Sequence, residues 1–521
     1  MQKDVVLVLS PKQASSEKFY LSMAAQKLKI SPNRITKIQI LKRSIDARKK
    51  KVKIQLRVLV FIDTLPQEKP PIEFDFKDVT HKEPVIIVGA GPAGLFAALK
   101  LLELGFKPIV IERGKDVIRR KRDISALHKN LNLDPNSNYG FGEGGAGAYS
   151  DGKLYSRSKK RGSIKGILNT LIFHGAYPDI FLDAHPHIGS EKLPKIIKNI
   201  RQTILDFGGE VHFQTRLAEL ILKSHKIVGI RTCSGDTLKA KAVILATGHS
   251  ARDIYEMLDK QGMVLEAKPF AMGVRIEHPQ ELIDSIQYSC LQRGPYLPAA
   301  AYSLVQQIEN RGVYTFCMCP GGVIVPASTA PGEMVVNGMS PSNRNSRWAN
   351  SGMVVEIRLE DVDSFQSTHI LNGLNFQRDF EKKAFANGGE GQIAPAQRAV
   401  DFIDGKLSNP MPDTSFRPGI QSSPLHEWMP ENIRKRIQLG LHAFDQKMKG
   451  YLTNEAVLIG VESRTSSPVR IPRDKQSFQH PQIEGLFPSG EGAGYAGGIV
   501  SSAIDGENSA LKVSSFMTQK F

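Results

Sequence analysis

The amino-acid sequence predicts the α/β fold class, with a parallel-sheet domain that is interrupted by an inserted α+β domain and preceded by a small α+β domain. Residues 85–112 have the pattern of a strand–helix–strand unit with a glycine-rich turn. An apolar strand at 243–248 and another that ends at Ser489 return the chain to this sheet, whereas strands with Pro- and Gly-rich turns fill much of the region between them. The expected domains are 1–75, 84–261 with its return at 453–521, and the insert at 262–452.

The N-terminal segment is expected to have the order strand, helix, strand, strand. An amphipathic helix at 15–28 follows a strand at 4–9, and two strands at 34–41 and 52–62 complete part of a ferredoxin-like fold. Residues 1–83 hold 18 Lys and Arg against 9 Asp and Glu, a large share of the net charge of +17. Six cations crowd one turn: Lys42, Arg43, Arg48, Lys49, Lys50 and Lys51. The turn is a solvated hairpin tip or a contact for an acidic partner, and the lack of interleaved aromatic residues disfavours RNA.

A G-x-G-x-x-G spacing connects the first strand of the parallel-sheet domain to its helix. Gly89, Gly91 and Gly94 permit a tight turn, close approach of the backbone to a pyrophosphate, and close packing of helix on strand. Glu112 ends the next strand about 20 residues later, where a carboxylate accepts the hydroxyl groups of an adenosine ribose. These features predict a dinucleotide site; the alternative is a tight turn alone.

Residues 139–154, Y-G-F-G-E-G-G-A-G-A-Y-S-D-G-K-L, hold too many glycines for a regular element, because ordering glycine costs conformational entropy. Such a backbone can lie against a flat ligand and offer N–H groups to its phosphates. We interpret the stretch as a ligand-binding loop that ends near Lys153; the alternative is a surface loop. Helices at 117–129 and 192–207 flank it, and a three-stranded meander at 217–241 follows.

The inserted domain is interpreted as the substrate domain, with helices at 376–385 and 431–447. Cys317 and Cys319 are expected on one face of a strand, as a buried structural pair, a redox pair or a metal site. Residues 183–187, D-A-H-P-H, are a candidate proton donor, with surface or hydrogen-bonded histidines as the favoured alternative.

The C-terminal stretch adds a carboxylate and further glycines to the parallel sheet. Glu491 follows the last strand, and Gly497 and Gly498 open a helix that runs to about residue 513. The N-terminus of a helix carries N–H groups without partners and partial positive charge, which suit a phosphate or another anionic edge.

Composition predicts a cytoplasmic protein. No run reaches the roughly 18 apolar residues of a membrane helix, and the N-terminus lacks the pattern of a signal peptide, so no membrane contact is expected. The four cysteines are too few and too scattered for a disulfide framework or a four-thiolate metal site, and no metal is expected.

With these residues in view, the chain resembles the FAD-dependent oxidoreductases of glutathione-reductase-like fold, and more closely a group of bacterial FAD-dependent dehydrogenases. The broader resemblance is carried by G-A-G-P-A-G with Glu112, by the meander that ends in A-T-G, and by G-E-G-A-G. The closer one is carried by R-S-I-D-A-R-K, F-G-E-G-G-A-G-A-Y-S-D-G-K-L, P-H-I-G-S, N-G-M-S and R-T-S-S-P-V-R-I. It implies a Rossmann-like FAD-binding domain with FAD as the cofactor.

The resemblance also implies where FAD binds, from the pyrophosphate at the first glycines to the flavin ring between residues 142–153 and the last glycines. Glu491 stands where many relatives have Asp. The implied cofactor-binding residues are Gly89, Gly91, Pro92, Ala93, Gly94, Glu112, Arg113, Gly142, Gly144, Gly145, Lys153, Arg216, Leu217, Ala246, Thr247, Gly248, Gly490, Glu491, Gly497, Gly498 and Ile499.

The implied activity is hydride transfer between N5 of FAD and a small-molecule substrate. His187, Lys153 and Arg464 are the candidate acid–base or orienting residues, with a structural salt bridge as the alternative for Arg464. NAD(P)H or a redox partner protein is a candidate for the other half-reaction. Two alternatives are an FAD-dependent RNA- or tRNA-modifying enzyme that docks through its basic N-terminal domain, and a flavoprotein with a structural FAD.

Overall fold

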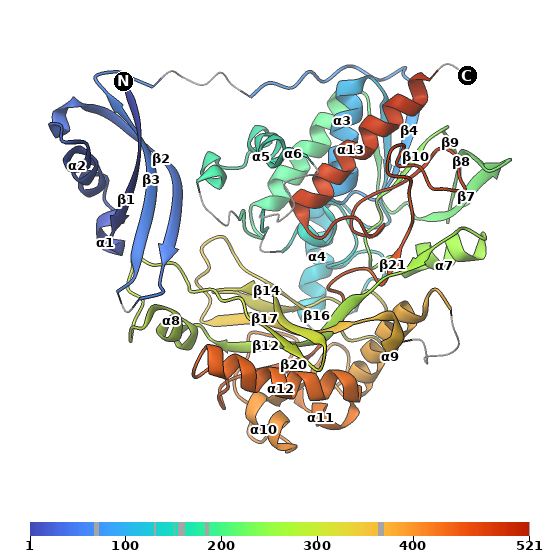
Figure 1. The fold of residues 1–521 in the computed structure, drawn as a ribbon. Coiled ribbons are helices and arrows are strands. Elements are labelled where there is room, and N and C mark those ends of the chain that lie inside the picture. The colour runs from blue at the N-terminus through green and yellow to red at the C-terminus, as the bar shows by residue number, and fades with distance from the viewer. Residues whose placement is uncertain are drawn as a thin grey trace.

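The computed structural model of the chain contains an N-terminal domain, a parallel-sheet domain and a mixed-sheet domain (Figure 1). The residues that it describes are 1–49, 51–66, 72–129, 132–150, 152–154, 162–182, 187–362 and 369–519. Within them, no helix is long and apolar enough to cross a membrane. Lys50 and residues 183–186, which belong to two of the predictions above, lie outside the described residues.

The N-terminal domain has the predicted order of elements. Its antiparallel sheet has the order β1-β3-β2, and Val5, Leu7 and Leu9 point from β1 into a core while the residues between them are exposed. The turn between β2 and β3 rests on the mixed-sheet domain through Ala47 and Val52. The elements are β1 (Gln2–Leu9), α1 (Pro11–Ala14), α2 (Glu17–Leu28), β2 (Ile35–Asp46) and β3 (Lys53–Ile62).

The parallel-sheet domain is built on five strands in the order β22-β10-β4-β5-β6, all parallel. Val85 and Ile87 of β4 face a core shared with α3, α6 and α13, whereas Ile86 and Val88 face the core of the meander and α7. Because both faces of β4 are buried, its sequence is continuously apolar. Figure 1 shows α13, from the end of the chain, beside α3.

The helices at Ile164–Phe173 and Arg252–Lys260 were not predicted, and the other elements of this domain agree with the predicted ones to within about five residues at each end. They are β4 (Pro84–Val88), α3 (Pro92–Leu104), β5 (Lys107–Ile111), α4 (Val117–His128), α5 (Ile164–Phe173), α6 (Leu193–Asp206), β6 (Glu210–His212), β7 (Leu217–Lys223), β8 (Lys226–Thr232), β9 (Thr237–Lys239), β10 (Val243–Leu245), α7 (Arg252–Lys260), β22 (Leu486–Pro488) and α13 (Ile499–Thr518).

The mixed-sheet domain contains a seven-stranded sheet in the order β13-β14-β17-β12-β20-β18-β19, and α12 packs against β12, β14 and β17. Strand β20 lies in this sheet although it follows residue 452, where the inserted domain was expected to end. The elements are β11 (Glu266–Ala267), β12 (Phe270–Pro279), α8 (Gln280–Tyr288), β13 (Val305–Ile308), β14 (Arg311–Cys319), β15 (Val323–Pro326), β16 (Val336–Met339), β17 (Trp348–Ile357), α9 (Asn372–Ala386), β18 (Ala394–Arg398), α10 (Ala399–Asp404), β19 (Ile420–Ser422), α11 (Leu425–Trp428), α12 (Glu431–Lys447), β20 (Val457–Glu462) and β21 (Val469–Arg470).

Candidate functional site

The glycines between β4 and α3 are required by the local geometry, and each for a different reason. Gly89 has φ +107°, and a Cβ there would lie 2.5 Å from the carbonyl oxygen of Ala246. A Cβ at Gly94 would lie 1.9 Å from the carbonyl oxygen of Gly89, so α3 approaches the turn too closely for any side chain. At Gly91 the nearest atom to such a Cβ is Cα of Gly145, 3.9 Å away. The first and third glycines therefore serve the fold, and the middle one keeps the backbone accessible.

Glu112 connects this turn to the glycine loop at residues 142–147. Its Oε2 accepts the N–H of Ala90 at 2.9 Å, and its Oε1 accepts the N–H groups of Gly114 at 2.9 Å and Gly142 at 3.0 Å. The side chain is buried, and its three backbone donors fix its orientation. A carboxylate offers about four acceptor positions, so Glu112 retains capacity for a ribose hydroxyl.

The glycine loop lies across the first turns of two helices. The N–H of Gly144 donates to the carbonyl oxygen of Ala90 at 2.8 Å. A Cβ at Gly147 would lie 3.0 Å from Cγ1 of Ile499, the first residue of α13, and 3.9 Å from Cγ of Pro92, the first residue of α3. Three glycine segments that are far apart in sequence therefore meet where two helices begin.

Arg120 was not among the residues selected from the sequence. Its side chain fixes the backbone of the glycine loop through hydrogen bonds. This residue of α4 has no exposed surface, and its guanidinium donates to five carbonyl oxygens at 2.8–3.2 Å. Burial lowers its pKa to about 10, so it remains a cation near neutral pH. The accepting residues are Asn138, Tyr139, Gly142, Glu143 and Gly145. Because its carbonyl groups point toward Arg120, the loop has a fixed backbone shape.

Glu143 anchors the same loop to the neighbouring helices. Its Oε2 accepts the N–H of Val117 at 2.8 Å at the start of α4 and lies 3.3 Å from Nη1 of Arg201 in α6. Its other oxygen is buried without a hydrogen-bond partner. Burial raises the pKa of this carboxyl to about 7. In the sequence, the signal for this anchoring role is an acidic residue within a run of glycines.

The carboxyl end of the sheet brings the A-T-G segment and the C-terminal segment together. The N–H of Ala246 donates to the carbonyl oxygen of Val88 at 2.9 Å, and a Cβ at Gly492 would lie 2.5 Å from the carbonyl oxygen of Gly248. Glu491 therefore lies beside this segment, with Oε1 3.6 Å from Nδ1 of His249. His249 follows A-T-G directly and was not among the predicted residues.

A buried ion pair fixes the start of the C-terminal segment. The N–H of Gly490 donates to Oδ2 of Asp505 at 2.8 Å, and Asp505 pairs with Arg473 at 2.6 Å. Beyond it, Gly497 and Gly498 are exposed just before α13, and a Cβ at either would meet no atom within 4 Å. These glycines leave an open surface.

Arg113 and Arg216 flank Glu112 at the adenosine end of the expected site. The guanidinium of Arg113 pairs with Asp253 at 2.5 Å and lies 4.3 Å from the centre of the Phe141 ring. Arg216 donates from Nε to Sγ of Cys233 at 3.0 Å, directly before Leu217 opens β7. Both side chains therefore have protein partners in the described residues.

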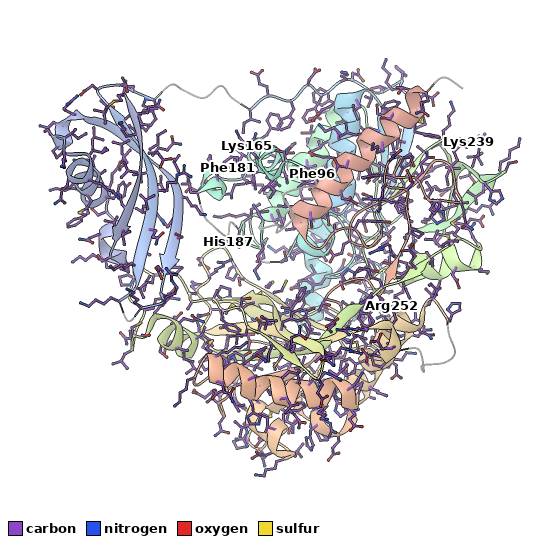
Figure 2. All side chains as sticks on the ribbon, viewed as in Figure 1. Phe96, Lys165, Phe181, His187, Lys239 and Arg252 are labelled. Atoms are coloured by element: carbon purple, nitrogen blue, oxygen red, sulfur yellow. The ribbon has the colours of Figure 1, made fainter. Side chains whose placement is uncertain are left out.

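The backbones of Lys153 and His187 form an antiparallel bridge, so the structure brings two of the three predicted catalytic residues together. Nζ of Lys153 donates to the carbonyl oxygen of Met318 at 2.5 Å, and Nε2 of His187 lies 3.1 Å from the carbonyl oxygen of Ser342. Both contacts reach the mixed-sheet domain, and Figure 2 labels His187 beside that domain.

Arg464, the third of these residues, belongs to a buried network at the junction of the two domains. Nη2 of Arg464 contacts Glu333 at 3.0 Å and Glu381 at 2.8 Å, and Arg252 of α7 pairs with the same two carboxylates at 3.0 and 2.8 Å. We call these four residues the junction network; one of them, Arg252, is labelled in Figure 2. Burial would lower the pKa of Arg464, but the two carboxylates outweigh burial and raise it. The arrangement agrees with the salt-bridge alternative for Arg464.

Cys317 and Cys319 do not share one environment, contrary to the C-x-C prediction. The pairing of β14 with β17 shifts register between Phe316 and Cys319, and Cys317 has φ +45°. This bulge interrupts the alternation of side chains. Cys319 is buried and Cys317 is exposed.

These segments fit an anionic dinucleotide. We call residues 89–94, 142–147, 246–248 and 490–498 the cradle. Its accessible glycines expose backbone, and two helices begin at its centre, where the first N–H groups lack partners within their helices and carry partial positive charge. Glu112 stands beside them for a ribose.

The comparisons with known proteins match three successive parts of the chain to family models. Residues 83–275 match the family described as pyridine nucleotide-disulphide oxidoreductase. Residues 269–465 match the family described as FAD-dependent protein, C-terminal domain-like, and residues 1–61 match a domain of unknown function.

Relatives extend the match to nearly the whole chain. An uncharacterized protein of Clostridium beijerinckii is 41% identical over 515 residues and 95% of each chain. The protein FixC of Salmonella typhi is 28% identical over 222 residues, 38% of this chain and 44% of FixC.

Among solved structures, a flavoprotein/dehydrogenase from Cytophaga hutchinsonii has a TM-score of 0.35 and 11% identity, over 84% of this chain and 80% of that one. The protein CtdE in complex with FAD has a TM-score of 0.31 and 12% identity over 84% of each chain. The sequence matches identify the cofactor as FAD and the activity as that of an oxidoreductase. The chain belongs to the FAD-dependent oxidoreductases, in a family that joins a pyridine nucleotide-disulphide oxidoreductase domain to an FAD-dependent C-terminal domain.

Proposed function

We propose that the protein is a dehydrogenase that transfers a hydride between a small organic molecule and FAD held in the cradle. The observation that carries this proposal is the meeting of the α3 and α13 N-termini at Gly147, beside Glu112. When bound, FAD supplies N5 as the acceptor or donor of the hydride. The residues of the chain bind the cofactor, orient the substrate and exclude water.

The cofactor contacts follow from the cradle. The backbone of residues 91–94 would hold the pyrophosphate, because N–H groups and the helix dipole there stabilise negative charge. The carboxylate of Glu112 would accept the ribose hydroxyl groups, and Glu491 would contact the pyrophosphate or the ribityl chain. Arg120 acts as a positioning residue, because its five hydrogen bonds fix the glycine loop.

The substrate binds between the cradle and the mixed-sheet domain. Lys153 and His187 belong to the parallel-sheet part of the chain but contact Met318 and Ser342 of the mixed-sheet domain, which supports a place at this boundary. The ammonium group of Lys153 suits an anionic substrate, and His187 is the nearer candidate for proton transfer. Arg464 serves as a positioning residue, since its guanidinium contacts Glu333, Glu381 and Thr329.

The test is an absorbance spectrum of the purified protein, followed by anaerobic titration with NADH and with NADPH. We expect a flavin spectrum in which the 450 nm band is bleached by one nicotinamide or, if neither acts, by the enzyme's own reduced substrate. Dithionite serves as the positive control for reducibility. A protein that neither contains FAD nor binds added FAD contradicts the proposal.

A matched pair of variants separates cofactor binding from substrate chemistry. Lys153→Met should slow flavin reduction by the substrate at least tenfold and leave the FAD dissociation constant within twofold of wild type. Lys192→Met, which removes an exposed ammonium beside Tyr177, should change neither quantity. Equal reduction rates in Lys153→Met and wild type would remove Lys153 from the substrate site.

A further inference from the structure

A group of polar side chains meets on the face of the mixed-sheet domain that is turned toward the parallel-sheet domain. Strand β16 packs on β12, β14, β17 and β20, and α12 lies on the other side of this sheet (Figure 1). At the end of β16, Sδ of Met339 lies 3.9 Å from the hydroxyl of Tyr139, shortly before the glycine loop. Strand β16 therefore lies at the boundary where the substrate is proposed to bind.

Arg275 of β12 organises this group from within the sheet, although it has no exposed surface. Its Nη1 donates to Oε2 of Glu462 at 2.6 Å and to Oδ1 of Asn337 at 3.3 Å, and its Nη2 donates to the carbonyl oxygen of Cys317 at 2.8 Å. A Cβ at Gly338 would lie 2.1 Å from Nη2, so the close approach of β16 requires glycine at this position. One guanidinium thus connects β16 to the bulge of β14.

These contacts determine which atoms of Asn337 face outward. The backbone N–H of Gly338 also donates to Oδ1 of Asn337, at 2.7 Å. Guanidinium and backbone N–H groups only donate, so the atom between them is the amide oxygen, and the NH2 group is turned away from Arg275. Asn337 is exposed, and no acceptor within the described residues bonds its NH2 group. The side chain therefore presents two fixed N–H donors to a ligand.

The bulge of β14 adds a thiol and an ammonium group to this amide. The side chain of Cys317 is exposed, and Nζ of Lys153 donates to the carbonyl oxygen of the next residue, Met318. Desolvation by the surrounding protein raises the pKa of the Cys317 thiol, so its exposed surface faces neighbouring protein groups rather than open solvent. The thiol therefore lies between the Lys153 ammonium and the Asn337 amide.

The charges around the thiol favour an anion of modest charge. The charged side chains with the largest effect on Cys317 are Lys153, Arg275 and Glu462. Glu462 is buried and pairs with Arg275 at 2.6 Å, so the ammonium of Lys153 supplies the net positive charge. A carboxylate matches one ammonium and one amide, whereas phosphate sites usually have a guanidinium fork or several charged donors.

We infer that Lys153 and Asn337 bind the carboxylate group of the substrate, which makes the substrate a carboxylic acid. This inference rests on the proposed dehydrogenase function, in which the same site holds the molecule that exchanges a hydride with FAD. Arg275 is a positioning residue, because it fixes the amide of Asn337 from a buried position. Cys317 lines the site, so its thiol reports on molecules that bind there.

The experiment compares alkylation of Cys317 in the full-length protein by iodoacetate and by iodoacetamide. In both reactions the thiol sulfur bonds to the CH2 carbon, iodide leaves and the thiol proton passes to solvent, but only iodoacetate carries a carboxylate. Both reagents meet the same thiol at one pH, so the pKa of the thiol cancels from the ratio of their rates. Peptide mass spectrometry, with fragmentation to separate Cys317 from Cys319, measures the rates. The denatured chain gives the reference ratio.

We expect an iodoacetate-to-iodoacetamide ratio at Cys317 at least about tenfold above the reference, with an iodoacetate rate that saturates and that acetate, but not acetamide, suppresses. Asn337→Asp keeps an acceptor for Arg275 but presents a carboxylate, and Lys153→Met removes the ammonium, so each variant should lower the ratio to the reference or below. Asn454→Asp, at an exposed turn of the same domain, is the matched control and should keep the wild-type ratio. Thermal unfolding confirms that the variants are folded.

Four results would overturn the inference: a Cys317 that neither reagent alkylates in the folded protein, a wild-type ratio equal to the reference, a ratio that neither Asn337→Asp nor Lys153→Met changes, or stronger protection by inorganic phosphate than by acetate. None of them bears on FAD. The flavin absorbance of the same samples tests the proposed function separately. A protein that binds no FAD but keeps the preference for iodoacetate would refute the dehydrogenase and retain the carboxylate site.

Discussion

The cradle and the junction network lie side by side but are stabilised in opposite ways. The cradle is made of backbone, held by glycines such as Gly89 and Gly94 that admit no Cβ and by Arg120, whose hydrogen-bond partners are all carbonyl groups. The junction network is made of side chains, with two guanidinium and two carboxylate groups buried together. The stability of the cradle should therefore be sensitive to added side-chain volume, and that of the junction network to the loss of a charge.

Adding one methyl group to the cradle should have the largest effect. In Gly94→Ala, the new Cβ would lie 1.9 Å from the carbonyl oxygen of Gly89, and both atoms belong to packed backbone. We expect a loss of about 3 kcal/mol or more in the free energy of unfolding, together with loss of FAD binding. Denaturant unfolding and the flavin content of the purified protein measure these effects. A stable yellow Gly94→Ala protein would contradict the tight turn.

Removing one charge from the junction network should have the next largest effect. Glu381→Gln keeps the shape but leaves Arg252 and Arg464 with Glu333 alone in a buried site, which should cost about 3–5 kcal/mol of unfolding free energy. Asp413→Asn is the control, because its pair with Arg347 is exposed and should contribute below about 1 kcal/mol. Equal losses of unfolding free energy in the two variants would show that burial does not increase the contribution of the network to stability.

Arg120→Lys tests whether the shape of the cradle depends on the guanidinium. Lysine retains a positive charge but has three donors and no planar fork, so at least two loop carbonyls lose their partner. We expect a loss of about 2–3 kcal/mol in stability and at least tenfold weaker FAD binding. Arg119→Lys, at the exposed neighbouring position, should resemble wild type in both measurements. An Arg120→Lys protein with wild-type stability and wild-type FAD affinity would show that the shape of the loop does not depend on the guanidinium group.

Glu143 should produce a smaller, pH-dependent effect. Burial raises the pKa of its carboxyl from an ordinary 4.5 to about 7, so its contribution to stability is complete below about pH 4.5 and is lost as pH rises through about 7. From pH 5 to pH 8, titration of Glu143 alone should lower the free energy of unfolding by of the order of 2 kcal/mol.

Replacing Glu143 by Gln removes the titration and should flatten the stability profile by this amount. Denaturant unfolding of wild type and Glu143→Gln at several pH values gives the difference directly. Parallel profiles would show that the carboxyl titrates as it does in the unfolded chain.

The sequence was sufficient for features whose residues lie close together in the chain. The glycine turn, Glu112 and the strand–helix–strand unit are local, and the structure confirms the α/β class and the order of the elements around them. Arg120 could not be selected, because the sequence around α4 offers several basic residues and only packing shows which one is buried. His249 was missed for a similar reason, since its partner Glu491 lies more than 240 residues away.

The prediction for the two cysteines failed for a different reason. Side chains alternate between the two faces only in a regular strand. Strand β14 has a bulge between Phe316 and Cys319, and no pattern in the sequence predicts it. For Arg464, the sequence left two roles open, and the structure places its guanidinium among carboxylates from loops and helices that are distant in sequence.

The most direct test of the cradle is the FAD affinity of Gly91→Ala. A Cβ at Gly91 would have its nearest neighbour 3.9 Å away, so the apoprotein should fold with unchanged stability, whereas the methyl group would occupy space next to the pyrophosphate. Gly166→Ala in α5, where a Cβ would also have ordinary contacts, is the matched control. We predict an FAD dissociation constant at least tenfold above wild type for Gly91→Ala and within twofold for Gly166→Ala. A folded Gly91→Ala protein that binds FAD as tightly as wild type would contradict the account.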